Sequence, residues 1–158
     1  MVGKAKPVPP GYHTVTPYLS IRGAAQAIEF YKKAFGAEVV FRLDMDGGKI
    51  GHAEIRIGDS HIMLADEFPD MPDAICVSPL TLGGTTAGMN LYGEDVDARF
   101  KRAVEAGATV RRPIQDQFYG DRSGTLMDPF GHLWTVSTHI EDVTPEEIKK
   151  RIAAMAKG

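Results

Sequence analysis

The sequence predicts an α+β fold in which a βαβββ module occurs twice in tandem. Three observations favour this fold: strand-like alternation of apolar and polar residues, helical stripes that end at glycine, and an internal repeat. The segments FGAEVVFR and AGATVRR align at Gly36 and Gly107, which stand 71 positions apart. The segments GDSHIML and PFGHLWT align at His61 and His132 with the same offset. Two aligned ends at one offset indicate a duplicated module.

The repeat divides the chain into five segments. Residues 1–13 form an arm that contains prolines and lysines, and the two modules span 14–66 and 87–140. Residues 67–86 hold three prolines and two glycines and have no counterpart in the repeat, so we expect a linker or a lid. Residues 141–158 add a C-terminal helix, which begins at the capping-box sequence TPEE.

In the first module, alternation and helical spacing place five elements. The first strand contains Pro17, which places that strand at a sheet edge or over a bulge. The helix carries Ile28, Tyr31 and Phe35 on one side, and Gly36 ends it. The expected elements are a helix at 23–35 and strands at 14–21, 38–44, 51–57 and 61–65.

The second module repeats this order and closes with a hairpin. The sequence DPFG between its last two strands is typical of a reverse turn, in which Asp128 binds nearby backbone amides. Along the last strand, Trp134 and Val136 point to one face, which we expect to join the core. Thr135 and Ser137 point to the other face. The expected elements are a helix at 95–106 and strands at 88–92, 108–112, 122–127 and 132–139.

Composition limits the class of protein. With 43% apolar and 25% charged residues, the 158-residue chain is typical of a soluble globular protein. A net charge of −3 without a block of like charge argues against a nucleic acid partner. No apolar run is long enough to span a membrane, and the N-terminus lacks a signal-peptide core, so no membrane partner is expected. A single cysteine, Cys76, suits the cytosol, and we expect a cytoplasmic protein.

Three stretches resemble one known family. The segments AIEFYKKAFGAE, GHAEIRIGDSHIMLADE and FYGDRSGTLMDPFGHLWTVSTH are similar to the vicinal oxygen chelate superfamily, and to its small PhnB-like branch in particular. This superfamily includes glyoxalase I, bleomycin-resistance proteins and extradiol dioxygenases. The resemblance implies curved mixed sheets around a cavity, with the helices on the convex side. It implies little about chemistry, because the superfamily performs many reactions on one scaffold.

Strand alternation combined with this fold assigns residues to the two sides of the sheets. Val15, Leu19 and Ile21 of the first strand would pack on a helix, and Thr16 would face the cavity with other polar side chains. We expect an unknown small molecule to bind there. The candidate ligand-binding residues are Tyr18, His52, Glu54, Arg56, Asn90, Tyr92, Tyr119 and Arg122.

The segment before the seventh strand leaves two interpretations open. Arg122 would clamp a carboxylate or phosphonate, or else form a salt bridge to Asp121 or Asp128 that fixes the hairpin. Phe118 and Tyr119 would line the mouth of the cavity or pack in an interface.

The resemblance also provides a test for a metal site. Metal-dependent members bind a divalent ion through His or Glu at four inward positions, which correspond here to Thr16, Met63, Gly88 and Thr135. Hydroxyls and a thioether are weak ligands for such ions, and glycine offers no side chain. We therefore expect no metal at this centre and no other cofactor.

Three functions remain compatible with the sequence. The first is a metal-free binding protein. The second is a lyase- or dioxygenase-type enzyme, with a displaced metal site that uses His52, Glu54 and His61 or with His52 and Glu54 as a metal-free acid and base. The third is a structural or regulatory dimer whose pocket is vestigial. We expect a homodimer, because curved sheets in a small chain leave edges that need cover.

Overall fold

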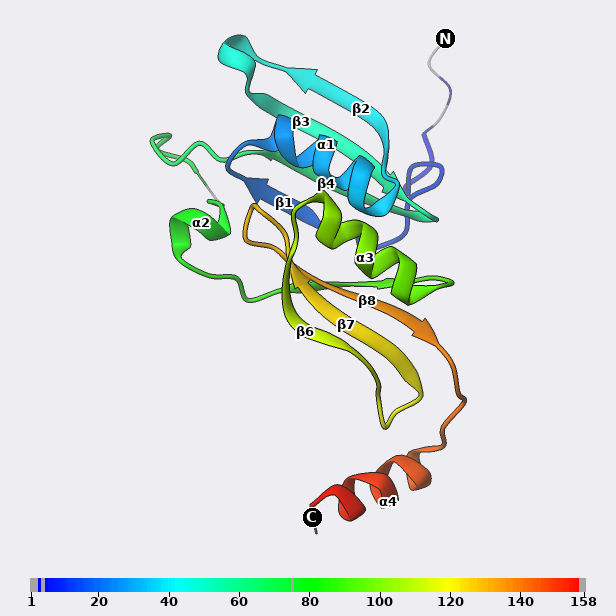
Figure 1. Ribbon diagram of the computed structural model, residues 1–158. Coiled ribbons are helices and arrows are strands. Elements are labelled where there is room, and N and C mark those ends of the chain that lie inside the picture. Colours follow the sequence, from blue (N-terminus) through cyan, green and yellow to red (C-terminus); the bar gives the residue numbers. More distant parts are fainter. Residues whose placement is uncertain (1–2, 4, 75, 157–158) are drawn as a thin grey trace. The chain divides into compact units, whose positions relative to one another are not determined.

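The structure of the chain is a computed structural model that describes residues 3, 5–74 and 76–156. The chain forms two compact units, Met1–Gly84 and Thr85–Gly158. Each unit contains one four-stranded sheet with a helix packed on it (Figure 1). The expected arm, linker and C-terminal helix each include residues outside the described part, namely 1–2 and 4, 75, and 157–158. The exact module boundaries stay predictions.

The first unit has the expected order of elements. Its sheet runs β1-β4-β3-β2, with β1 parallel to β4 and the other pairs antiparallel. A short 3₁₀ turn, Asp46–Gly48, joins β2 to β3, and a short helix follows the module. The elements are β1 (Tyr18–Ile21), α1 (Ala24–Phe35), β2 (Glu38–Asp44), β3 (Ile50–Ile57), β4 (Ser60–Asp66) and α2 (Pro79–Leu82).

The second unit repeats this topology. Its sheet runs β5-β8-β7-β6, again with one parallel pair, β5 with β8. The matching order confirms the α+β fold of duplicated βαβββ modules. The elements are β5 (Gly88–Tyr92), α3 (Val96–Ala106), β6 (Thr109–Asp116), β7 (Asp121–Met127), β8 (Leu133–His139) and α4 (Pro145–Met155).

Helix α1 receives its N-terminal cap from a distant residue. Gly23 precedes the helix and has no side chain that could accept a hydrogen bond. The buried carboxylate of Asp66, at the end of β4, accepts hydrogen bonds from the backbone N–H groups of Gly23 and Ala24, both at 3.0 Å. It also accepts one from Ile50 at 2.7 Å. Asp66 therefore ties together α1, β3 and β4.

The turn between β7 and β8 forms as the sequence predicts. Asp128 is buried, and its carboxylate accepts hydrogen bonds from the backbone N–H groups of Phe130 and His132, both at 2.9 Å. The same carboxylate accepts a third hydrogen bond from the indole nitrogen of Trp134 at 2.9 Å. Trp134 is only 1% exposed, which confirms that it belongs to the core.

Some predicted details of secondary structure differ from the structure. The first strand begins at Tyr18 rather than at residue 14, and Val15 is 83% exposed instead of buried. Pro17 has no N–H for the sheet, although its carbonyl still accepts a hydrogen bond from Met63. Within residues 67–86, where the sequence predicted no helix or strand, Ser78 caps the short helix α2. The capping box of α4 is half formed, since the side chain of Glu147 binds Arg151 instead of the helix start.

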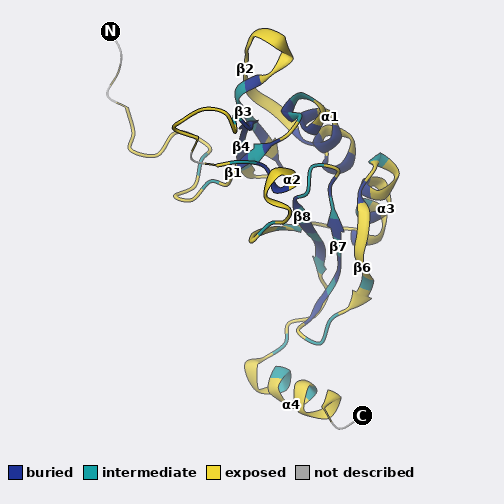
Figure 2. Cartoon of the chain, turned by 90° about the vertical axis from the view of Figure 1, so that its left-hand side faces the viewer, coloured by how far each residue is buried: buried dark blue, intermediate teal, exposed yellow. Residues whose placement is uncertain are grey.

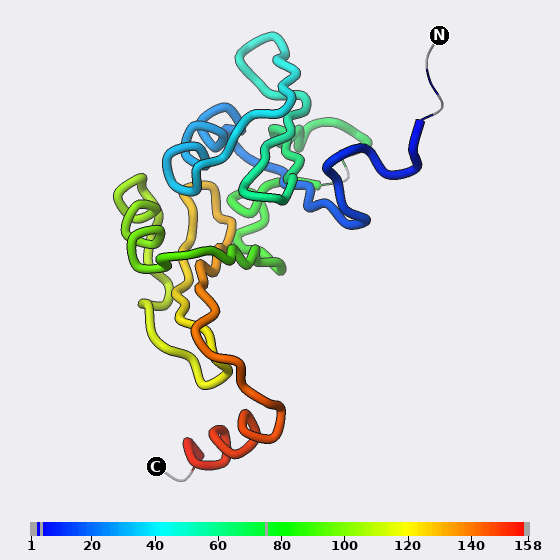
Figure 3. Tube along the Cα trace, turned by 90° about the vertical axis from the view of Figure 1, so that its right-hand side faces the viewer, coloured from blue at the N-terminus to red at the C-terminus, as the bar shows by residue number. Residues whose placement is uncertain are grey.

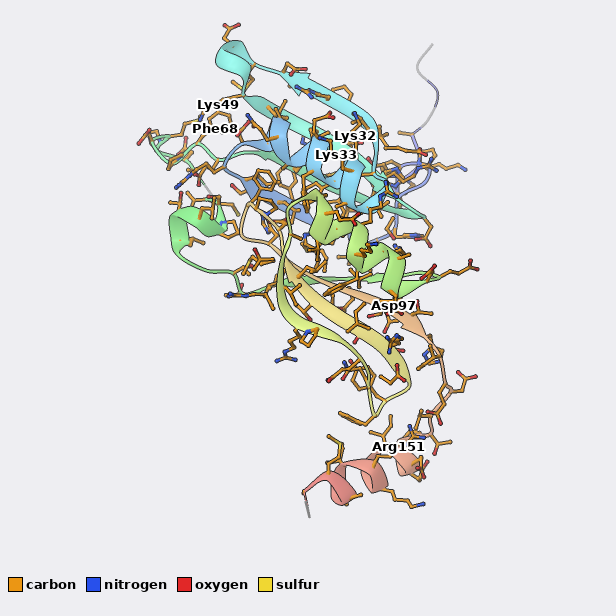
Figure 4. The ribbon with its side chains drawn as sticks, viewed as in Figure 1. Lys32, Lys33, Lys49, Phe68, Asp97 and Arg151 are labelled. Carbon is orange, nitrogen blue, oxygen red and sulfur yellow. The ribbon has the colours of Figure 1, made fainter. Side chains whose placement is uncertain are left out.

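Helix α4 lies past the end of the sheet of its unit rather than on a face of it (Figure 3). Its surface is mostly exposed, as is that of β2 in the first unit (Figure 2). Arg151 attaches α4 through Glu141, at 2.7 and 2.9 Å, and through the carbonyl of Phe118 at 3.2 Å (Figure 4). Among the described residues, no helix has the length and apolar character that spanning a membrane requires.

Candidate functional site

The face of the first sheet opposite α1 carries a row of polar side chains, and we call it the open face. In β3, Ala53 and Ile55 are fully buried on the helix side, so His52 and Glu54 point to the open face. Sheet register places Glu54 beside Met63 of β4, and Met63 beside Tyr18 of β1. Three predicted site residues, Tyr18, His52 and Glu54, therefore lie together.

These side chains form a continuous row of hydrogen bonds. The hydroxyl of Tyr18 lies 3.0 Å from Nδ1 of His52, and Nε2 of His52 lies 3.3 Å from a carboxylate oxygen of Glu54. The other oxygen of Glu54 accepts a hydrogen bond from the hydroxyl of Tyr12. The Tyr12 ring stacks on His61, with 4.1 Å between ring centroids. The row thus runs from phenol to imidazole to carboxylate to a second phenol.

Sequence reasoning missed Tyr12, because the arm has no periodic pattern. The available signal was the segment PPGY, in which a turn positions an aromatic residue ahead of β1. Gly11 takes a left-handed conformation, with φ of 83°, and the Tyr12 N–H donates to the carbonyl of Pro9. This turn places Tyr12 against Glu54 and His61 of the open face.

Local electrostatics set the protonation of this row. Burial, followed by the hydrogen bond to Glu54, raises the pKa of Tyr12 to about 12. The hydrogen bond from Tyr12 lowers the pKa of Glu54 below its ordinary value, against the opposing effect of burial. Burial also raises the pKa of Tyr18. At neutral pH the row therefore holds an ionised carboxylate and two protonated phenols.

A pocket of about 450 Å³ adjoins Tyr18 in the same unit. One wall consists of β1 and β4, and the other consists of the start of the predicted linker. The hydroxyl of Ser20 reaches the carbonyl of Cys76 at 3.3 Å and so connects the two walls. The lining is mostly apolar, as is usual for small-molecule sites. The lining residues are Tyr18, Ser20, Ala65, Asp66, Phe68, Met71, Asp73, Ala74 and Cys76.

A second, polar pocket of about 390 Å³ lies near the start of α1. Its cations already have partners: Arg22 binds the buried Glu67 at 2.8 Å, and Lys49 lies 5.0 Å from the centre of the Phe68 ring (Figure 4). Glu67 also binds the backbone N–H of Ser78 and the hydroxyl of Thr81, both at 2.7 Å. These contacts fix both ends of the segment that walls the apolar pocket.

The remaining predicted residue of the first unit, Arg56, is exposed and pairs with Glu38 of the neighbouring strand β2. Arg56 shares the open face with Glu54, since the two are two positions apart in β3. The structure does not bring Arg56 to the lining of the apolar pocket.

In the second unit, Asn90 and Tyr92 share one face of the sheet. Asn90 pairs with Thr135 in register, and the Tyr92 hydroxyl donates to the buried carboxylate of Asp121 at 2.6 Å. The other oxygen of Asp121 lies 2.8 Å from Nδ1 of His139. The hydrogen bond to Asp121 raises the pKa of Tyr92, and burial adds to this rise.

Arg122 lies on the opposite face of β7 from Asp121. It binds Asp97 of α3 at 2.8 Å and Asp116 of β6 at 2.8 Å, so the expected partners, Asp121 and Asp128, are wrong. Asp97 is labelled on α3 in Figure 4. Tyr119 is 40% exposed and contacts the ring of Phe118 edge-on. The structure therefore does not bring Arg122 together with Asn90 and Tyr92.

The four positions that the sequence resemblance assigns to a metal centre do not offer suitable ligands. Met63 supplies a thioether, and Gly88 supplies no side chain. The Thr135 hydroxyl lies 3.1 Å from that of Thr125, and Thr16 likewise offers only a hydroxyl. Within residues 3, 5–74 and 76–156, no group of three or more His, Cys, Asp or Glu side chains is arranged to hold a metal ion. The residues present do not fit a hard divalent cation.

We expect protein purified without a tag to contain only substoichiometric zinc, manganese, nickel or iron, because hydroxyl and thioether donors compete poorly with water. Inductively coupled plasma mass spectrometry measures this directly. Stoichiometric metal that disappears in Thr135→Val would contradict the expectation. Metal that disappears in His52→Ala would instead indicate a displaced site.

Comparison with known proteins identifies the family. Residues 13–136 match the glyoxalase/bleomycin resistance protein/dioxygenase superfamily. The chain belongs to this superfamily, as the sequence resemblance predicts.

Individual relatives agree with this assignment. Protein Rv0887c of Mycobacterium tuberculosis is 40% identical over 144 residues, which cover 91% of this chain and 85% of that protein. The crystal structure of TioX from Micromonospora sp. ML1 is 25% identical, with a TM-score of 0.61 over 81% of this chain and 99% of TioX. The PhnB protein of Bacillus cereus, at 16% identity, shares the fold with a TM-score of 0.61 over 80% of this chain and 99% of its own.

Proposed function

We propose that this protein binds a small molecule in the apolar pocket of its first unit without the help of a metal ion. The observation that carries the proposal is the pocket itself, about 450 Å³ in volume, between β1, β4 and the segment after β4. Its size and mostly apolar lining are those of small-molecule sites. The unsuitable donors at the superfamily's metal positions also favour binding over metal-assisted chemistry.

A second candidate function is metal-free proton transfer. The row formed by Tyr18, His52 and Glu54 favours it, because a phenol, an imidazole and an ionised carboxylate in sequence are able to relay a proton. Tyr18 lines the pocket, so the relay would end at a bound molecule. Binding followed by conversion of the ligand would support this alternative, and binding of an unaltered ligand would support the first proposal.

A substitution that fills the pocket tests the proposed binding. Ser20→Phe places a bulky side chain in the pocket wall, and we expect the variant to lose small molecules that the wild-type protein retains or captures. Native mass spectrometry detects retained molecules, and NMR titration with a library of small apolar compounds detects captured ones, through the amide signals of Ala65 and Met71. Ser60→Phe is the matched control, because Ser60 is exposed and does not line the pocket. Equal binding by wild type and Ser20→Phe would contradict the proposal.

We also propose that the protein is a homodimer, with β2 in the interface. β2 is an edge strand of its sheet and presents apolar side chains to solvent, an arrangement that invites pairing with a second copy. The exposed apolar residues in and next to β2 are Val39, Val40, Phe41, Leu43 and Met45.

Sedimentation velocity tests the dimer. We expect a dimer at micromolar concentration. The double variant Phe41→Lys with Leu43→Lys should be a monomer, because the interface would have to bury the added lysine charges, and these would repel the lysines of the second copy. Val15→Lys is the control, since Val15 is exposed outside the sheet. A wild-type protein that sediments only as a 17.2 kDa species would contradict the proposal.

A further inference from the structure

We infer that the apolar pocket of the first unit selects apolar molecules that carry a protonated amine and discriminates against carboxylates and phosphonates. The inference rests on the proposed binding function and specifies the chemistry of the ligand. It follows from the direction of the hydrogen bonds around the pocket and from the charges of its lining.

The first argument concerns the proton of Tyr18. Glu54 is ionised, so its carboxylate only accepts hydrogen bonds, and the proton between it and His52 resides on Nε2 of the ring. With the proton on Nε2, Nδ1 presents a lone pair and accepts the Tyr18 hydroxyl proton at 3.0 Å. The Tyr18 oxygen is left with lone pairs alone, and Tyr18 is one of the residues that line the pocket.

The second hydroxyl of the lining behaves in the same way. The Ser20 hydroxyl donates its proton to the carbonyl of Cys76 at 3.3 Å, because a carbonyl only accepts. Its oxygen therefore also presents lone pairs. A ligand meets two hydroxyl oxygens whose protons are already committed, so a donor group finds partners and an acceptor group does not.

The third argument is charge. The lining contains two carboxylates: Asp66 is satisfied by three backbone N–H groups, and Asp73 is exposed. Among the described lining residues there is no lysine or arginine. Lys49 lies against the ring of Phe68 but lines the separate polar pocket (Figure 4). An anion in the apolar pocket would face lone pairs and a like charge, whereas a cation would face complementary groups.

The experiment compares three probes with the same apolar body: 4-phenylbutylamine, 4-phenylbutan-1-ol and 4-phenylbutyrate. Dissociation constants are measured at pH 7 by NMR titration of the amide signals of Ser20, Ala65 and Met71. We expect the amine to bind about tenfold or more tightly than the carboxylate, with the alcohol between them. Equal binding of amine and carboxylate, or preference for the carboxylate, would overturn the inference but leave the binding function intact. Failure of all three probes to shift these signals at millimolar concentration would contradict the proposed function itself.

Two variants test whether the named groups cause the selectivity. Tyr18→Phe keeps the ring and removes the acceptor oxygen, and Asp73→Asn keeps the shape and removes the charge. Each is expected to reduce the ratio of amine to carboxylate affinity by about threefold to tenfold. Asp59→Asn is the matched control, because Asp59 is exposed and outside the pocket lining, and its ratio should equal that of wild type. An unchanged ratio in both test variants would overturn the inference.

Discussion

Replacing Asp128 with alanine is expected to lower the free energy of unfolding of the second unit by about 3–5 kcal/mol, since each buried donor left without a partner costs about 1–3 kcal/mol. The substitution removes the common acceptor of three donors: the backbone N–H groups of Phe130 and His132 and the indole N–H of Trp134. Trp134 is 1% exposed, so water does not readily replace the lost acceptor at the indole.

Urea unfolding followed by tryptophan fluorescence measures this effect directly, because Trp134 is the only tryptophan of the chain and lies within the affected unit. Asp128→Asn provides a graded comparison. Its amide oxygen still accepts from the two backbone groups, but its NH₂ group faces the indole N–H, donor against donor, so an intermediate loss is expected. A change of less than about 0.5 kcal/mol in Asp128→Ala would show that the carboxylate does not hold the turn.

Glu67→Gln is expected to destabilise the first unit by about 2 kcal/mol at neutral pH, after allowance for the solvent exposure of Arg22. Burial acts to raise the pKa of Glu67, but hydrogen bonds from Arg22, Ser78 and Thr81 outweigh it and lower the pKa to about 2. Glutamine keeps the shape of the side chain and loses the charge that these donors stabilise. The variant should also loosen the segment after β4, because Glu67 holds Ser78 and Thr81.

The sign of the pH dependence follows from this shift. The folded pKa of Glu67 lies below the unfolded value, so its contribution to stability is fully present above the unfolded pKa, about 4.3, and is lost as pH falls toward about 2. Thermal unfolding followed by circular dichroism from pH 7 to pH 2 should show a shallower acid loss in Glu67→Gln than in wild type. Hydrogen exchange at the Ser78 amide should be faster in the variant at neutral pH, and this difference should shrink as pH falls toward about 2.

Glu141→Gln is the matched control for this experiment. Glu141 also pairs with an arginine, Arg151, and this hydrogen bond lowers its pKa, but its side chain is 51% exposed. Exposed ion pairs contribute little to stability, so only a small change is expected. Equal acid sensitivity of wild type and Glu67→Gln would refute the role assigned to Glu67.

Much of the fold was predictable because it depends on local patterns. The alternation along β3 and β8, the helix ends at Gly36 and Gly107, and the turn at Asp128 all arise from neighbouring residues. The cap of α1 was not predictable, since its acceptor, Asp66, lies 42 positions from Ala24. A hydrogen bond between residues so far apart leaves no periodic trace in the sequence.

The candidate site also contains residues that the sequence could predict and residues that it could not. Period-two alternation placed His52 and Glu54 on one face, because both belong to a regular strand. The other wall of the pocket comes from an irregular segment, whose side-chain directions no period specifies. Arg122 was placed among the ligand-binding candidates although it shares parity with the buried Leu126 of β7, and that parity was the available signal that it faces α3.

The wall of the apolar pocket contains the single thiol of the chain, Cys76, which is exposed. A cysteine-directed alkylating reagent therefore has one point of attack, and that point borders the space where a ligand would bind. Each alkylation adds a fixed mass, so the progress of labelling is readable on intact protein over time. A ligand bound in the pocket would slow the labelling of Cys76. The labelling rate therefore reports ligand binding without any engineered tag or dye.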